Sequence, residues 1–172
     1  SDQDKGETNG RYPIVGRDRD LKRLLDQGKN VFIGVGQIKS FHPRLRLFKL
    51  IKDYGSKLPT IISPAAFCSR SASIGEGSIL MHHALVNANT KVGFNCIINS
   101  KALLEHDVEV GSHCHISTGA IINGGVRVGE KSFIGSGAVI KEGIKIGDEV
   151  IIGAGLTITK NIPDGKTLKH QN

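Results

Sequence analysis

The chain has 172 residues, a net charge of +7, 22 glycines and no tryptophan. Its aromatic residues are two tyrosines and six phenylalanines. Globular cores usually rely on aromatic side chains for buried area, so this composition favours a narrow, repetitive interior. No segment has the ~20 consecutive apolar residues that a membrane-spanning helix needs, and no signal-peptide pattern opens the sequence. We therefore expect a cytoplasmic protein that does not enter the membrane.

The 23 lysine and arginine residues are scattered along the chain rather than gathered in runs. Aromatic residues are not interleaved with them, as they are in proteins that stack nucleic-acid bases. No recognisable nucleic-acid-binding module is present. The basic charge therefore does not predict a nucleic-acid partner. It fits an ordinary solvated surface, or contacts with a phosphorylated small molecule such as coenzyme A.

The first third of the sequence predicts four elements in the order helix, strand, helix, strand. They cover residues 17–28, 31–35, about 40–54 and 58–62. In the first of them, Leu21, Leu24 and Leu25 follow helical spacing, and Gly28 can end the helix. This order is typical of the second half of a small α/β domain, which we assign to residues 1–62.

The first half of such an α/β domain is not found in the sequence. A nucleotide-binding domain of this type normally starts with a strand and a glycine-rich phosphate-binding turn. Gly34-Val35-Gly36 alone is too short a signal for that turn, and the sequence begins abruptly with Ser1-Asp2-Gln3. We therefore expect residues 1–62 to be an incomplete, Rossmann-like domain.

From residue 74 onward the sequence repeats every six residues. Fifteen consecutive positions at this spacing are aliphatic: Ile74, Leu80, Val86, Val92, Ile98, Leu104, Val110, Ile116, Ile122, Val128, Ile134, Ile140, Ile146, Ile152 and Ile158. A second row, mostly of small residues, precedes the first by two places and so points to the same side of each strand. A hexapeptide period predicts a parallel β-helix, whose coils are stabilised by their neighbours.

Glycine recurs with a longer period of 18 residues. The positions are Gly75, Gly93, Gly111, Gly129 and Gly147. Three hexapeptides therefore make one triangular coil, and about five coils fit between residues 74 and 158. We expect the β-helix over residues 63–160 and a C-terminal tail over 161–172. Glycine suits a corner whose backbone conformation other residues avoid.

One short stretch combines histidines with carboxylates. Glu105, His106 and Asp107 stand together at a corner, and the residues one coil away from His106 are small, Ala88 and Gly124. Histidine suits the role of general base near neutral pH, and an adjacent carboxylate can hold its tautomer. Backbone N–H groups near Gly124 and Gly125 are candidates for stabilising an oxyanion. His106 is the candidate catalytic residue, and an ordinary surface histidine is the alternative.

A metal site is a second alternative. The histidines at positions 82, 83, 106, 113 and 115 could supply ligands. Trimeric β-helix enzymes that resemble the γ-class carbonic anhydrases carry two zinc ligands five residues apart, with a third about two coils earlier. No pair in this cluster has that spacing, so we expect no metal.

The order of motifs resembles a known family, the sugar O-/N-acyltransferases. These are typified by sialic acid O-acetyltransferases and by the bacillosamine-pathway enzyme that acetylates a UDP-4-amino sugar. The resemblance rests on Lys57–Ala66, Ile97-Ile98-Asn99-Ser100, Leu104-Glu105-His106-Asp107 and Val110–Ser117. It covers nearly the whole chain.

The resemblance implies a left-handed β-helix, a homotrimer, and active sites in the clefts between subunits, with acetyl-CoA as the acyl donor. The residue matching His106 is the general base of that family. The acid that follows it, usually glutamate, assists; here it is Asp107, with Glu105 as the other adjacent acid. The N-terminal domain of the family holds a nucleotide-sugar, whose phosphate loop this sequence lacks, as it lacks the usual terminal Gly-x-Pro-Ala segment.

The resemblance also implies which other residues line the site. Asn99 contacts the substrate, and His115 lies near the thioester of acetyl-CoA. Gly124 offers backbone contacts, and Gly153 and Ala154 carry the pantetheine arm. The sequence thus predicts an acetyl-CoA-dependent acetyltransferase that modifies an amino, or a hydroxyl, group of a sugar or nucleotide-sugar. A non-catalytic β-helix scaffold and, less favoured, a trimeric metal hydro-lyase remain as alternatives.

Overall fold

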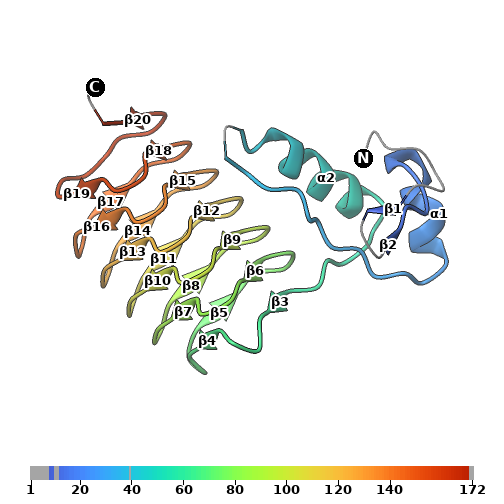
Figure 1. The fold of residues 1–172 in the computed structure, drawn as a ribbon, viewed down its shortest axis with the longest axis horizontal. Coiled ribbons are helices and arrows are strands. Elements are labelled where there is room, and N and C mark those ends of the chain that lie inside the picture. The colour runs from blue at the N-terminus through green and yellow to red at the C-terminus, as the bar shows by residue number, and fades with distance from the viewer. Residues whose placement is uncertain (1–7, 10–11, 39, 171–172) are drawn as a thin grey trace.

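The protein is described by a computed structural model that covers residues 8–9, 12–38 and 40–170. Its main body is a long parallel β-helix, with a helical N-terminal part beside it (Figure 1). The N-terminal elements are an antiparallel pair, a 3-10 turn and two helices: β1 (Thr8–Asn9), β2 (Tyr12–Pro13), η1 (Asp18–Asp20), α1 (Leu21–Asp26) and α2 (His42–Asp53). Residues 1–7, the first part of the expected α/β domain, and residues 171–172 of the expected tail lie outside the described residues.

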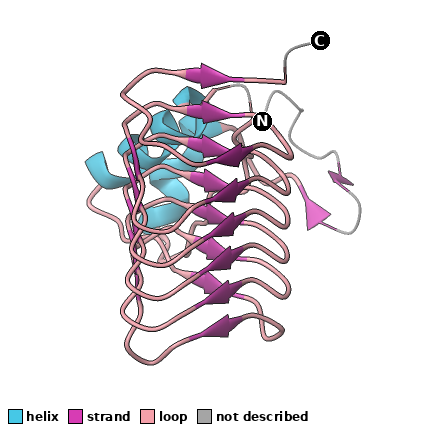
Figure 2. Ribbon diagram, turned by 90° about the vertical axis from the view of Figure 1, so that its left-hand side faces the viewer, coloured by secondary structure: helices cyan, strands magenta, loops and turns pink. Residues whose placement is uncertain are grey.

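Strands β3 to β20 form three parallel sheets, which are the faces of a triangular prism. Successive strands stack one above another along it (Figure 2). The aliphatic face holds β4 (Phe67–Cys68), β7 (Leu85–Val86), β10 (Leu103–Leu104), β13 (Ile121–Ile122), β16 (Val139–Ile140) and β19 (Thr157–Ile158). The charged face holds β5 (Ser73–Ile74), β8 (Lys91–Val92), β11 (Glu109–Val110), β14 (Arg127–Val128) and β17 (Lys145–Ile146). The third face lies against the N-terminal part and is called the covered face. It holds β3 (Ile61–Ile62), β6 (Ile79–Leu80), β9 (Ile97–Ile98), β12 (His115–Ile116), β15 (Phe133–Ile134), β18 (Ile151–Ile152) and β20 (Thr167–Leu168).

The period of 18 residues fixes the register of the sheets. Leu103 pairs with Ile121, and His115 pairs with Phe133, each exactly one coil later in the chain. The second residue of each strand points inward, so that Ile98, Ile116 and Ile134 are fully buried. The predicted parallel β-helix is confirmed, but it has about six coils rather than five, since paired strands run from β3 to β20.

The glycine corners have a different cause from the one expected. At the edge that carries these glycines, the residues with a left-handed backbone conformation come two positions after each glycine, for example Asn95 (φ 56°) and His113 (φ 62°). The glycines are needed for close approach instead. A Cβ on Gly93 would lie 2.7 Å from the backbone nitrogen of Ser112, and one on Gly111 would lie 2.8 Å from that of Glu130. Stacked corners of neighbouring coils therefore exclude any side chain at these places.

The two predicted helices form, with tighter limits, but the two predicted strands before the repeat do not form as expected. Residues 31–35 have no regular secondary structure. Residues 61–62, the end of the second predicted strand, form β3 and pair with β6 as part of the β-helix. The sheets therefore extend beyond the expected range of 63–160, both at β3 and at β20. The reason is that the partner of β3 is the coil above it, so this strand is not available to an α/β sheet.

The N-terminal part has a small apolar core of its own and is tied to the β-helix by a buried arginine. Ile33, Ile51 and Leu58 form this core. Arg44 of α2 is 1% exposed and donates hydrogen bonds to main-chain carbonyls on both sides of the junction. None of the helices that the structure describes is both long and apolar enough to cross a bilayer.

Candidate active site

His106 lies in the turn between β10 and β11, at the edge shared by the aliphatic and charged faces. Its side chain is 62% exposed, and its Nδ1 lies 2.8 Å from Oδ2 of Asp107. The imidazole hydrogen bond, followed by one from Asn89, lowers the pKa of the Asp107 carboxyl. An ionised carboxylate only accepts hydrogen bonds, so Nδ1 of His106 carries the proton. Nε2 is then left with a lone pair that can accept a proton from a substrate.

The coil below holds both neighbouring acids of His106. Nδ2 of Asn89 donates to Oδ1 of Asp107 at 3.2 Å, which leaves Oδ2 for the imidazole. Nδ2 of Asn87 donates to Oε2 of Glu105 at 2.8 Å. Of the two acids expected to assist, Asp107 therefore holds the imidazole, whereas Glu105 contacts the coil below.

The coil above leaves room for the imidazole because it has glycine at position 124. A Cβ on Gly124 would lie 2.8 Å from both Cε1 and Nε2 of His106. The main chain of this coil is also tied to His106, since the N–H of Gly125 donates to its carbonyl at 3.0 Å. The expected small neighbour of the candidate base is therefore a steric requirement of its position.

Asn99 and His115 meet on another side of the prism. His115 is on the covered face and is 5% exposed. Its Nδ1 contacts the carbonyl oxygen of Gln37, and its Nε2 lies 3.1 Å from Nδ2 of Asn99. Burial lowers the pKa of His115, so the ring is neutral at physiological pH. A cavity of about 340 Å³ adjoins this pair, between residues 32–38 and strands β6 and β9.

Within one chain, His106 and His115 therefore do not form one site. They are nine residues apart, half of an 18-residue coil, so His115 lies on the face opposite the edge that carries His106. His113 belongs to a third place, the edge between the charged and covered faces, where it contacts Phe48 of α2. The three histidines are close in sequence but lie at different places around the prism of a single chain, because a few residues of sequence lead from one face of the coil to the next.

Comparisons with known proteins agree with this fold. Two family models match the repeat region: the bacterial transferase hexapeptide (six repeats) over residues 89–124, and the hexapeptide repeat of succinyl-transferase over residues 125–160. No curated protein sequence matches the chain. Among solved structures, the acetyltransferase domain of PglB from Neisseria gonorrhoeae FA1090 is 35% identical, with a TM-score of 0.90 over 97% of this chain and 80% of that one.

Two further solved structures carry ligands. The same PglB domain in complex with acetyl coenzyme A is 35% identical and has a TM-score of 0.89, over 97% of this chain and 80% of that one. A histidine-to-asparagine variant of perosamine N-acetyltransferase from Caulobacter crescentus, in complex with CoA and GDP-perosamine, is 33% identical. Its TM-score is 0.89, over 95% of this chain and 77% of that one. The chain belongs to the hexapeptide-repeat sugar acyltransferases.

The remaining expected residues of the acyltransferase lie along the edge between the covered and aliphatic faces. Gly153 and Ala154 follow β18 in the turn that stacks, three coils later, on the turn of Asn99. The carbonyl of Ala154 accepts a hydrogen bond from Nε2 of His170 at 2.9 Å. Asn99, Gly153 and Ala154 thus share one edge of the prism, parallel to its axis.

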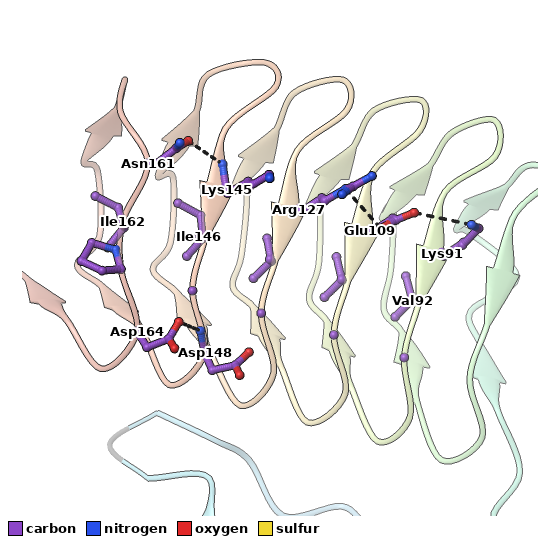
Figure 3. Close-up of a pocket in the computed structure, with 17 residues that line it drawn as sticks. Lys91, Val92, Glu109, Arg127, Lys145, Ile146, Asp148, Asn161, Ile162 and Asp164 are labelled. Carbon is purple, nitrogen blue, oxygen red and sulfur yellow. Dashed lines mark hydrogen bonds and ion pairs between the residues drawn. The ribbon is translucent and has the colours of Figure 1, made fainter.

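A larger cavity than the one beside His115 lies elsewhere on the acyltransferase. It is an open groove of about 950 Å³ along the charged face (Figure 3). Its rim is a row of charged side chains in which Glu109 pairs with Lys91 at 3.5 Å and with Arg127 at 3.3 Å. Its floor is the inward row beside the glycine corners, including Val92 and Ile146. None of the expected site residues lines this groove.

No group of three or more His, Cys, Asp or Glu side chains placed to hold a metal ion occurs among the residues that the structure describes. Several residues around the expected site were not predicted from the sequence. Asn87 and Asn89 bind Glu105 and Asp107, and Gln37 contacts His115. Arg44 lines the cavity beside His115. Asn89 could have been found by stepping 18 residues back from Asp107. Gln37 and Arg44 carry no such periodic signal.

We expect the acyltransferase to lose stability on acidification because of His113. Burial, followed by the positive charges of Lys131, Arg44 and Lys49, lowers the pKa of His113 from 6.5 to about 4. Between these values the unfolded chain binds a proton that the folded chain does not, so the free energy of unfolding falls as pH decreases through this window. The loss is at most about 3 kcal/mol by pH 4.

Urea unfolding across this pH range measures the effect. His113→Gln should flatten the pH dependence relative to wild type, whereas His42→Gln, which changes an exposed histidine of α2, should leave it unchanged. Equal slopes for the His113→Gln variant and the wild type would show that His113 titrates normally in the folded protein.

Proposed function

We propose that this acyltransferase moves the acetyl group of acetyl-CoA to the amino group of a nucleotide-linked sugar, with His106 as the general base. The single observation that carries this role is the His106–Asp107 pair, which leaves Nε2 free beside the glycine of the next coil. As the sugar nitrogen attacks the thioester carbonyl, Nε2 takes its proton. The C–N bond forms, the C–S bond breaks, and the CoA thiolate leaves with a proton from the imidazolium.

The choice of substrates is supported by the relatives. A structure of the PglB domain holds acetyl coenzyme A, and structures of perosamine N-acetyltransferase hold CoA with GDP-perosamine. An amino group on a nucleotide-linked sugar therefore ranks ahead of a sugar hydroxyl as the acceptor. Residues 1–62 would supply part of the nucleotide-sugar-binding domain. The β-helix would be left-handed, and the enzyme would be cytoplasmic.

The aliphatic face supports a homotrimer as part of this proposal. Its outward residues are apolar in the first five of its six strands, none of them fully buried in the single chain: Phe67, Leu85, Leu103, Ile121 and Val139; the sixth is Thr157. Such a stripe is typical of a subunit interface. Its two edges carry the turns of His106 and of Asn99. If three such faces pack around one axis, the edge with His106 of one subunit meets the edge with Asn99 of the next.

The proposed active site is thus composite. His106 and Asp107 come from one subunit, and Asn99 with His115 come from its neighbour. Gly153 and Ala154 lie further along the neighbour's edge, where they can follow an extended pantetheine arm. Gly124 stands beside His106, where its main chain can face the developing oxyanion.

Subunit complementation tests this arrangement. His106→Ala and His115→Ala are each expected to be inactive, and co-refolding them in equal amounts should restore about a quarter of the wild-type activity, the share of sites that receive both native residues. If both residues came from one chain, no mixture could restore activity. The wild-type assay uses acetyl-CoA with a nucleotide-linked 4-amino sugar, and with sialic acid as the hydroxyl acceptor.

Thermal unfolding with and without CoA supplies a readout without turnover. A ligand that binds only the folded state raises the Tm. No shift with CoA, together with no transfer to either acceptor, would contradict the proposed function and favour a non-catalytic scaffold.

A further inference from the structure

A buried arginine organises the segment that covers His115. The guanidinium of Arg44 contacts the carbonyl of Ile33 and donates to that of Val35 at 3.0 Å. It also donates to the carbonyls of two β-helix corners, Gly77 at 3.1 Å and Asn95 at 3.2 Å. The hydrogen bonds of this buried side chain therefore go to main-chain oxygens rather than to a carboxylate, and they tie the irregular segment 33–35 to the β-helix.

The same segment ends in the residue that contacts His115. Nε2 of Gln37 donates to the carbonyl of His113 at 2.8 Å, which anchors the residue, and Gln37 is 2% exposed. The carbonyl oxygen of Gln37 meets Nδ1 of His115. A carbonyl oxygen can only accept a hydrogen bond. Nδ1 of His115 must therefore carry the proton, and Nε2 must be the acceptor of the neutral ring.

The tautomer of His115 determines how Asn99 is turned. Oδ1 of Asn99 accepts from the N–H of Ser100 at 2.7 Å, and Nδ2 lies 3.1 Å from Nε2 of His115. One N–H of Nδ2 is used by the imidazole, and no described residue accepts the other. Because Asn99 lines the 340 Å³ cavity, that second N–H is available to a ligand there. The opposite tautomer would place an N–H against the amide and favour the flipped orientation.

We propose that Arg44 and Gln37 are positioning residues that hold His115 as the Nδ1–H tautomer and thereby make Asn99 a hydrogen-bond donor toward the cavity. This inference rests on the proposed function, since it assigns the cavity to the ligands of that reaction. The ligand atom facing Asn99 must be an acceptor, such as a carbonyl or hydroxyl oxygen. An ammonium or amide N–H at that place would be disfavoured, because two donors would meet.

Nitrogen NMR of the full chain with labelled histidine tests the tautomer directly. In wild type at neutral pH, His115 should show a protonated Nδ1 and a non-protonated Nε2, with its signals assigned by comparison with His115→Gln. In Arg44→Met, the two tautomers should both be populated, while the signals of His106 stay in place. Arg46→Met is the matched control, because Arg46 belongs to the same helix but pairs with Asp18 at 2.8 Å on the surface.

Asn99→Asp provides a variant that preserves the shape of the site. The carboxylate can accept from Ser100 but cannot donate to Nε2, so His115 should acquire a proton on Nε2. We expect kcat/KM to fall by about tenfold or more in this variant and in Arg44→Met, with Arg46→Met unchanged. A predominant Nε2–H tautomer in the wild type, or an unchanged tautomer in Arg44→Met, would overturn the inference. Since the spectra need no turnover, that outcome is distinct from a failure to observe acetyl transfer.

Discussion

Replacing His106 by alanine is expected to lower kcat for acetyl transfer by about 10²–10⁴-fold, the usual contribution of a general base. The Nδ1–Asp107 contact of 2.8 Å fixes the tautomer of the neutral ring, so that Nε2 is the nitrogen that can accept the proton. Without that acceptor, the attacking nitrogen must lose its proton to water, and the barrier rises accordingly. Steady-state kinetics with acetyl-CoA and a nucleotide-linked amino sugar measure the change.

Two measurements separate the loss of a base from the loss of the fold. The side chain of His106 is mainly solvent-exposed in the single chain, so the thermal stability of His106→Ala and its stabilisation by CoA should be retained. His42→Ala removes another exposed histidine and should leave kcat unchanged. A His106→Ala enzyme with wild-type kcat would exclude His106 as the base.

The coil itself could be predicted from sequence because its register is local and repeats. An inward aliphatic at Ile116 implies another at Ile134, since each coil pairs with the next at a fixed separation of 18 residues. The same step relates Asn89 to Asp107, whose side chains do form a hydrogen bond across coils. Phase along the coil also places His106 and His115 on different sides, which their closeness in sequence conceals.

The conformation of residues 31–37, the segment that packs over His115, could not be predicted from a repeat. Residues 31–35 have the composition of a buried strand, but their carbonyls are bound by a guanidinium and not by a neighbouring strand. Neither Gln37 nor Arg44 lies in a periodic pattern, and their contacts with the β-helix span between 33 and 78 residues of sequence. The glycine corners show the same limit, because the period was visible but the close packing that requires it was not.

Gly124→Ala should separate activity from stability. The added Cβ would lie 2.8 Å from Cε1 and Nε2 of His106, so the ring has to move. Gly124 is not among the residues with positive φ, so alanine fits its backbone. The atoms that must shift belong to the end of an exposed side chain, and stability should change little. Displacing the base by about 1 Å should lower kcat by up to about 10²-fold.

The neighbouring glycine is the matched control, with the opposite expected result. Gly125 has a φ of +66° and open space where a Cβ would stand. Gly125→Ala should therefore lower the free energy of unfolding by about 1 kcal/mol, the cost of a left-handed alanine, with kcat preserved. Urea unfolding measures the free energy of unfolding of each variant, and steady-state kinetics measure its kcat. If Gly124→Ala kept its kcat, the position of the His106 ring beside this glycine would not be the one used in catalysis, because no productive imidazole could share that space with a methyl group.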